Sequence, residues 1–245
     1  MISNYPGSEE AKIALQDLKS VYIDLNDINA YASYVNSIGG NIRLEVGEQD
    51  SLTYIAAEKL FMRGDNDGAR RSLINYLQTF PEGAFSSNAN FYLGSIAFAK
   101  KEFDEAIQRF KSVIASGDTK FLEESVARTA EIEYLSKDYP AALESFKRLQ
   151  IVAENPENRQ AARLGIMRCA LQTGQQKDAL LAADELLKEP KLSPELEAEA
   201  RYVRAKAYIA QKQANKALAD LKELSKDTRT VHGLSLIHIS EPTRL

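Results

Sequence analysis

Lys101-Glu-Phe-Asp-Glu-Ala106 is one of five short turns that end in alanine at a regular spacing along the chain. The others are Gly64-Asp-Asn-Asp-Gly-Ala69, Lys137-Asp-Tyr-Pro-Ala-Ala142, Gly174-Gln-Gln-Lys-Asp-Ala179 and Lys212-Gln-Ala-Asn-Lys-Ala217. Their closing alanines lie 37, 36, 37 and 38 residues apart. A degenerate sixth copy precedes them, Asn26-Asp-Ile-Asn-Ala-Tyr31, with tyrosine in place of the alanine. A fixed period of this length indicates a repeat architecture in which each copy is one supersecondary unit.

Each turn separates two segments that have the pattern of amphipathic helices. About fourteen residues before the turn and about twelve after it carry apolar side chains at positions i, i+3, i+4 and i+7. Ala, Leu, Glu, Lys and Gln dominate the composition, and the chain has no Trp, 12 Gly and 7 Pro. Because the dominant residues are good helix formers, we predict an all-α fold in which every copy is an antiparallel helical hairpin.

The second full copy carries the details of the motif. Its first helix reads Phe91-Tyr92-Leu93-Gly94-Ser95-Ile96-Ala97-Phe98, and its second helix begins Glu105-Ala106-Ile107-Gln108-Arg109-Phe110. These residues resemble the tetratricopeptide motif, which needs small residues at two positions because the two helices cross closely. The first of these positions holds Ala57, Gly94, Ala130 and Ala205, whereas the fourth copy departs from it with Met167. The resemblance covers roughly residues 8–230 and implies a right-handed superhelical solenoid of stacked hairpins.

The repeat positions predict the domain organisation. Residues 1–50 form a partial, degenerate hairpin followed by a linker over 38–50, and five hairpins follow at about 51–85, 86–121, 122–158, 159–194 and 195–230. Residues 231–245 have neither the alanine spacing nor the helix-forming composition of the repeats. Within them, Leu234–Arg244 closely resembles a translated sequencing adapter. We therefore interpret 231–245 as a non-native tail and the chain as an internal piece of a longer protein.

Charge and hydropathy restrict the class of protein. The formal charge of −4 comes from 35 acidic and 31 basic residues that are scattered along the chain, so we predict no nucleic-acid surface and no polybasic membrane tether. No run of about 18 apolar residues is present, so we predict no transmembrane segment in these residues. The single cysteine, Cys169, lies in an apolar stretch and is interpreted as a small buried side chain.

The patterns that enzymatic chemistry needs are missing from the sequence. It contains no Gly-rich phosphate loop, no His-Glu-x-x-His, no paired cysteines with zinc spacing and no Gly-x-Ser-x-Gly. Once the adapter-like segment is set aside, His232 is the one histidine left. Acidic pairs such as Glu131 with Glu133, and Glu197 with Glu199, are interpreted as solvated helix faces. We predict a non-catalytic protein without cofactor or metal.

Binding to a protein or peptide is the function that the repeat class implies. Stacked hairpins line their first helices along a concave surface, which holds an extended peptide or a partner's helix. The motif places eleven side chains toward that groove: Tyr54, Glu58, Phe61, Phe91, Ser95, Phe98, Glu131, Tyr134, Arg168, Tyr202 and Lys206. This set suits an apolar peptide with mixed charge. The alternative is that the aromatic residues pack between helices, with Tyr134 the better candidate for binding.

A narrower resemblance concerns the junctions between repeats. Tyr5-Pro6-x-Ser8-x-Glu10-Ala11, and Phe80-Pro81-x-Gly83 followed by Ala89-x-Phe91-Tyr92-Leu93-Gly94, look like junctions in two bacterial envelope proteins. These are the tetratricopeptide partner of the Tol–Pal system and the lipoprotein of the outer-membrane β-barrel assembly machine. The resemblance implies a periplasmic or outer-membrane-associated scaffold that serves cell-envelope assembly or maintenance.

Two alternatives stay open at this point. A cytoplasmic adaptor or co-chaperone that grips a C-terminal carboxylate needs Lys, Arg and Asn clustered on consecutive inner faces, whereas Arg168 and Lys206 are a full repeat apart. The other alternative is a regulatory arm of a larger enzyme or signalling protein.

Overall fold

The computed structural model describes residues 2, 8–38, 43–117, 119–227 and 230. Within these residues the chain forms twelve α-helices and no strand. The helices belong to two compact units, 1–121 and 122–245. The proposed tail, with its adapter-like segment and both histidines, lies outside the described residues, as do Tyr5 and Pro6 of the first junction.

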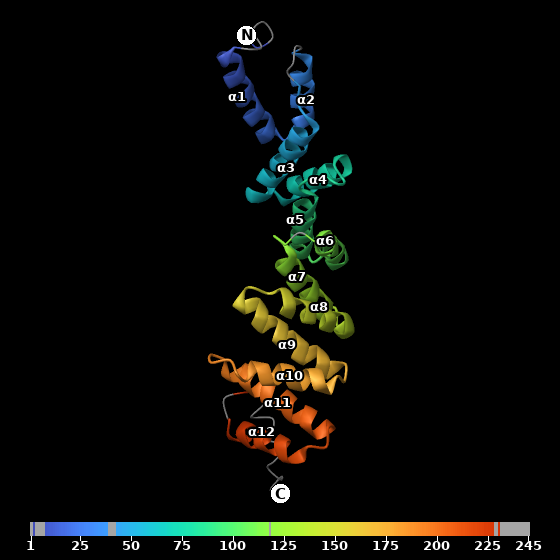
Figure 1. The fold of residues 1–245 in the computed structure, drawn as a ribbon, viewed down its shortest axis with the longest axis vertical. Helices are drawn as coiled ribbons and strands as arrows, with labels where there is room; N and C mark the ends of the chain where they lie inside the picture. Colours follow the sequence, from blue (N-terminus) through green and yellow to red (C-terminus); the bar gives the residue numbers. More distant parts are fainter. Residues whose placement is uncertain (1, 3–7, 39–42, 118, 228–229, 231–245) are drawn as a thin grey trace. The chain divides into compact units, whose positions relative to one another are not determined.

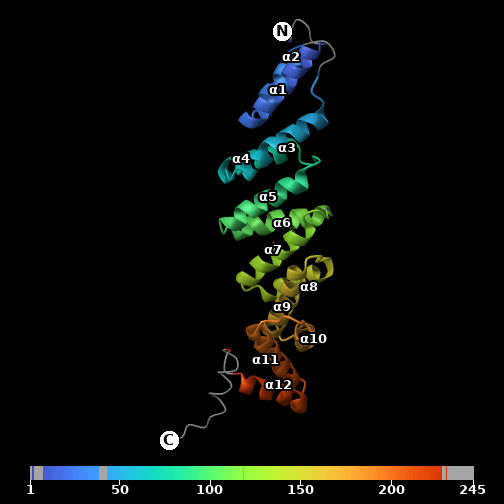
Figure 2. The same cartoon turned by 90° about the vertical axis from the view of Figure 1, so that its left-hand side faces the viewer.

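Each unit is a succession of helical hairpins (Figures 1 and 2). The helices of the first unit are α1 (Glu9–Leu25), α2 (Ile28–Ser37), α3 (Val46–Met62), α4 (Asn66–Thr79), α5 (Ser86–Ala99) and α6 (Phe103–Ser116). Those of the second are α7 (Leu122–Leu135), α8 (Tyr139–Val152), α9 (Pro156–Gln172), α10 (Gln176–Leu186), α11 (Pro194–Ala210) and α12 (Ala214–Lys226). No helix in the described part of the chain is long and apolar enough to cross a membrane.

The five turns share one backbone conformation. The first residue of each turn has a positive φ, between 60° and 82°, at Gly64, Lys101, Lys137, Gly174 and Lys212. This left-handed residue reverses the chain after the first helix. In two turns the next residue is an aspartate that caps the second helix, where Asp65 accepts from the backbone N–H of Gly68 and Asp138 from that of Ala141.

Small side chains let the two helices of a hairpin cross closely. The closing alanines Ala69, Ala106, Ala142, Ala179 and Ala217 are all at most 1% exposed. Across the crossing in the second full copy, a Cβ added to Gly94 would lie 2.8 Å from the ring of Phe110. In the fourth copy Met167 is fully buried, and α10 contributes three buried alanines, Ala179, Ala182 and Ala183.

The first hairpin departs from this pattern. Tyr31 stands where the other copies have the closing alanine, and its side chain is only 3% exposed. Its ring lies 5.9 Å from that of Tyr22 on the facing helix. Because a phenol ring occupies space that elsewhere holds a methyl group, α1 and α2 diverge from their turn (Figure 1).

The predicted linker over 38–50 is too long, since α3 already begins at Val46. The additional turn of helix is anchored by Asp50, which is 8% exposed. Its carboxylate accepts a hydrogen bond from the Tyr76 hydroxyl at 2.6 Å and another from the backbone N–H of Ala84 at 2.8 Å. The carboxylate therefore ties α3 to α4 and to the start of α5.

Candidate functional site

In the first unit, the predicted groove residue Tyr54 is buried. Its side chain is 3% exposed, and its hydroxyl donates to Glu58 Oε1 at 2.6 Å and accepts from Asn88 Nδ2 at 3.1 Å. Tyr92 donates to the same Glu58 oxygen at 2.9 Å. Burial raises the pKa of Tyr54 well above its usual range, and the hydrogen bond to Glu58 adds to the rise. The prediction that Tyr54 faces a groove is therefore wrong, because its hydroxyl completes a hydrogen-bond network between α3 and α5.

The other aromatic residues predicted for this part of the groove also pack within the unit. Phe61 lies 4.5 Å from Tyr92, Phe91 stacks on Phe121 at 4.2 Å, and Phe98 lies 6.1 Å from Phe103, all measured between ring centroids. All three are half-buried. Ser95 donates its hydroxyl to the carbonyl of Phe91 at 2.9 Å. The ring contacts agree with the alternative interpretation, in which the aromatic residues pack between helices.

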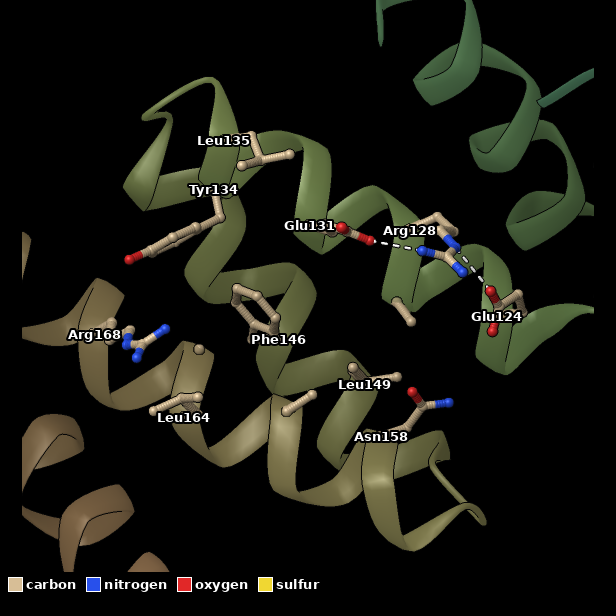
Figure 3. A pocket seen from close by; sticks show the side chains of 13 residues that line it. Glu124, Arg128, Glu131, Tyr134, Leu135, Phe146, Leu149, Asn158, Leu164 and Arg168 are labelled. Carbon is tan, nitrogen blue, oxygen red and sulfur yellow. Dashed lines mark hydrogen bonds and ion pairs between the residues drawn. The ribbon is translucent and has the colours of Figure 1, made fainter. Parts of the chain in front are cut away.

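The second unit contains a groove of about 290 Å³ between α7, α8 and α9 (Figure 3). Three of the predicted residues line it, Glu131, Tyr134 and Arg168. The remaining lining residues, which the motif does not place in the groove, are Glu124, Ala127, Arg128, Leu135, Phe146, Leu149, Asn158, Ala161, Leu164 and Gly165.

The floor of the groove is apolar and comes largely from the second helix of the hairpin. Phe146 and Leu149 of α8 lie between the two ends of the groove, with Leu164 of α9 beside them (Figure 3). Phe146 is 9% exposed, and its ring lies against the backbone of Gly165 in α9. The sequence does contain a signal for this opening, because Ala127 stands at the motif position of Tyr54 and Phe91 in the first two copies.

Ion pairs organise the rim. Arg128 donates to Glu124 at 2.8 Å and to Glu131 at 2.9 Å, so two carboxylates of α7 share one guanidinium. Arg168 forms a bidentate pair with Glu199 of α11, with both N–O distances 2.7 Å. The hydrogen bond to Glu199 raises the pKa of Arg168, so this guanidinium remains charged and oriented by Glu199.

The two ends of the groove differ in chemistry. Tyr134 and Arg168 lie at one end, and Asn158 and Glu124 at the other (Figure 3). The Tyr134 ring packs on Tyr139 and Phe146, with centroids 5.7 and 6.4 Å away. Asn158 donates its amide to Glu123 Oε1 at 2.7 Å, which fixes the orientation of its side chain.

The last two predicted residues, Tyr202 and Lys206, do not line this groove. The ammonium of Lys206 lies 5.4 Å from the Tyr202 ring centroid on α11. Arg168 is paired with Glu199. Arg168 and Lys206 therefore do not form the cation cluster that a carboxylate-gripping adaptor needs.

The interpretation of the acidic pairs as solvated is wrong for one member of each pair. Glu133 is 5% exposed and accepts from the Ser145 hydroxyl at 2.5 Å, and Glu199 is the partner of Arg168. Both carboxylates have a structural role between helices. Among the described residues, no three His, Cys, Asp or Glu side chains come together to hold a metal ion.

Comparison with known proteins leads to the same architecture. Residues 56–119 match the tetratricopeptide repeat family. No curated protein sequence matches the chain significantly. Among solved structures, the chain is similar to YrrB, a tetratricopeptide protein with an unusual peptide-binding site, with 17% identity and a TM-score of 0.57 over 76% of this chain and 91% of that one. It is also similar to the MamA protein, with 16% identity and a TM-score of 0.52 over 82% and 98%.

The similarity to YrrB and to MamA is a similarity of fold. The predicted all-α fold of stacked, antiparallel tetratricopeptide-type hairpins is confirmed. Stacked hairpins of this kind form an extended concave surface along their first helices.

Proposed function

We propose that this protein is a non-catalytic scaffold that binds a peptide or a partner's helix in the groove of α7, α8 and α9. The observation that carries the proposal is an apolar floor, made by Phe146, Leu149 and Leu164, beneath a rim of paired charges. A concave apolar surface with a few oriented polar groups is the usual form of a specific binding site. YrrB, which shares the fold, is described as having a peptide-binding site of its own.

The exposed side chain of Leu135 gives a direct test. Leu135 lines the groove and is 55% exposed, whereas Leu181 on α10 is 64% exposed and does not line the groove. Random short peptides displayed on phage are selected on the immobilised protein, and their affinities are measured by fluorescence anisotropy. We expect Leu135→Glu to weaken binding at least about tenfold and Leu181→Glu to leave it unchanged. Equal affinities for both variants and the wild type would place binding elsewhere and refute the proposal.

We further propose that the scaffold serves cell-envelope assembly or maintenance. Support comes from the junction Phe80-Pro81-x-Gly83, which belongs to the envelope-type resemblance and lies within the described residues. This junction has a specific packing, because a Cβ on Gly83 would lie 2.4 Å from the Tyr76 hydroxyl oxygen and 2.8 Å from the Phe80 Cβ. The test is fractionation of cells that express the complete gene with an epitope tag. Recovery with the periplasm or outer membrane supports the proposal, and recovery in the cytoplasm favours the adaptor alternative.

A further inference from the structure

Stacked aromatic pairs occupy one repeated position in the first unit. One ring comes three residues before the first small position of a copy, and the other comes nine residues before the same position of the next copy. The first pair is Tyr54 with Phe85, with centroids 4.4 Å apart and planes 3° apart. The second is Phe91 with Phe121, at 4.2 Å and 13°. In each pair one ring belongs to the first helix of a copy, and the other to the segment that follows the second helix of that copy.

The third copy lacks both rings. Its residues at the two positions are Ala127 and Asn158, and both line the groove of the second unit. The apolar surface that supports an aromatic pair is nevertheless present, in Phe146, Leu149 and Leu164. The groove is thus the volume that an aromatic pair fills in the first unit, left open because both positions carry smaller side chains.

The ionised side chains around this opening carry a net negative charge. On α7, Glu124 and Glu131 share the single guanidinium of Arg128, which leaves one excess negative charge on that rim. At the other end, Arg168 is balanced by Glu199. A cation next to the ring is therefore favoured over an anion. The chain has an internal parallel, because the ammonium of Lys120 lies 4.8 Å from the centroid of the Phe121 ring.

Resting on the proposed binding function, we propose that the groove receives an aromatic side chain of the partner, stacked between Ala127 and Asn158, with a Lys or Arg beside it in the partner's sequence. The partner's ring occupies space that the missing pair leaves open, and its apolar faces meet Phe146 and Leu164. Offset-stacked or edge contacts give aromatic side chains an advantage over aliphatic ones of similar area.

Small defined probes test this inference on the full chain. The methyl signals of Leu135, Leu149 and Leu164 are followed by NMR during titration with N-acetyl-Phe-Lys-amide, N-acetyl-Leu-Lys-amide and N-acetyl-Phe-Glu-amide. We expect the Phe-Lys probe to bind more tightly than either of the others by between about twofold and tenfold. Equal or stronger binding of the Leu-Lys probe overturns the aromatic assignment, and equal or stronger binding of the Phe-Glu probe overturns the cationic one. If none of the probes shifts these methyl signals, both the aromatic and the cationic assignment are overturned.

Filling the opening from within gives a second test. Ala127→Phe introduces the side-chain type that the first two copies carry at this position, and Asn158→Phe does the same from α9. Both variants should bind the Phe-Lys probe at least about tenfold more weakly than the wild type. The control Ala115→Phe, at an exposed site on α6, should bind the probe as the wild type does. Circular dichroism verifies that each variant is folded. A retained response in both groove variants overturns the inference.

The two proposals fail separately. If the selected peptides bind in a Leu135-dependent way but prefer aliphatic or acidic sequences, the scaffold function stands and the aromatic inference is wrong. If the Phe-Lys probe moves the three groove leucines but no displayed peptide binds, the groove has the inferred chemistry and the scaffold function is wrong.

Discussion

The ring of Phe146 in α8 lies directly against the backbone of Gly165 in α9, where an added Cβ would come within 2.4 Å of the ring carbons. This contact sets the distance between two neighbouring hairpins. It also keeps the Phe146 ring at the floor of the groove, because Gly165 has no side chain that would displace the ring.

Replacement of Gly165 by alanine should therefore destabilise the second unit. Overpacking costs about 1–3 kcal/mol, and the better helix propensity of alanine offsets up to about 1 kcal/mol of that. We expect a net loss of about 1 kcal/mol in urea denaturation followed by circular dichroism. Gly47→Ala in the first turn of α3 is the control, since an added Cβ there meets nothing within 4 Å. A Gly165→Ala variant as stable as Gly47→Ala would contradict the packing argument.

Among the carboxylates of the second unit, Asp220 should contribute most to the free energy of unfolding. Its side chain is 3% exposed and accepts two hydrogen bonds from Arg204, at 2.6 and 2.7 Å. Asp220→Ala leaves that guanidinium without its main partner and should cost about 3 kcal/mol. Glu223→Ala on the same helix removes an acid that is 53% exposed and should leave the stability nearly unchanged, because exposed ion pairs contribute little. Similar losses in the two variants would show that burial of the Asp220 pair has no special weight.

The shared turn conformation predicts opposite effects for two substitutions. Gly174 has φ +73° and open space around the Cβ position, so Gly174→Ala should cost about 1 kcal/mol through backbone strain alone. Lys137 has φ 61°, so Lys137→Gly should relieve a strain of about 1–2 kcal/mol. The greater chain entropy of glycine offsets about 0.5–1 kcal/mol of that gain, so the variant should be more stable than the wild type. Urea midpoints that move in the same direction for both variants would refute the left-handed turn.

Cys169 reports on the second unit through its ionisation. The residue is fully buried, and burial raises the pKa of its thiol to about 11. A raised pKa in the folded state gives stability that is present below the ordinary thiol pKa of about 8.5 and is lost as the pH rises toward the folded value. In urea denaturation at a series of pH values, Cys169→Ala should therefore lose less stability than the wild type between about pH 8 and 11.

The same burial predicts slow chemistry at neutral pH. A thiol reagent such as dithionitrobenzoate should react with Cys169 only on unfolding, and the rate should rise in urea together with the loss of helical signal. Fast labelling of the native protein would show that α9 opens around this residue.

Local sequence patterns are sufficient to predict most of the architecture. The alanine spacing identifies five hairpins, since a helix crossing at close range admits only a small side chain and the requirement recurs once per copy. Tyr31 is recognisable as a departure from the same rule. Its consequence, the divergence of α1 and α2, depends on how Tyr22 packs against it and cannot be derived from spacing.

The groove is only partly predictable, because a motif position gives the direction of a side chain and says nothing about what fills the space in front of it. Glu131, Tyr134 and Arg168 line the groove as the motif places them. Tyr54 has the same direction and is buried, because Phe85 stacks on it and Glu58 and Asn88 take its hydroxyl.

The amino-acid sequence alone determines the helical hairpins, their number in the repeat region and their turns, since these depend on residues close together along the chain. The tertiary structure decided which concave positions are closed and which is open. That choice depends on residues about 30 positions apart in the chain, such as Phe91 and Phe121, which stack on each other, and Ala127 and Asn158, which both line the open groove. Such residues come together only when neighbouring hairpins stack.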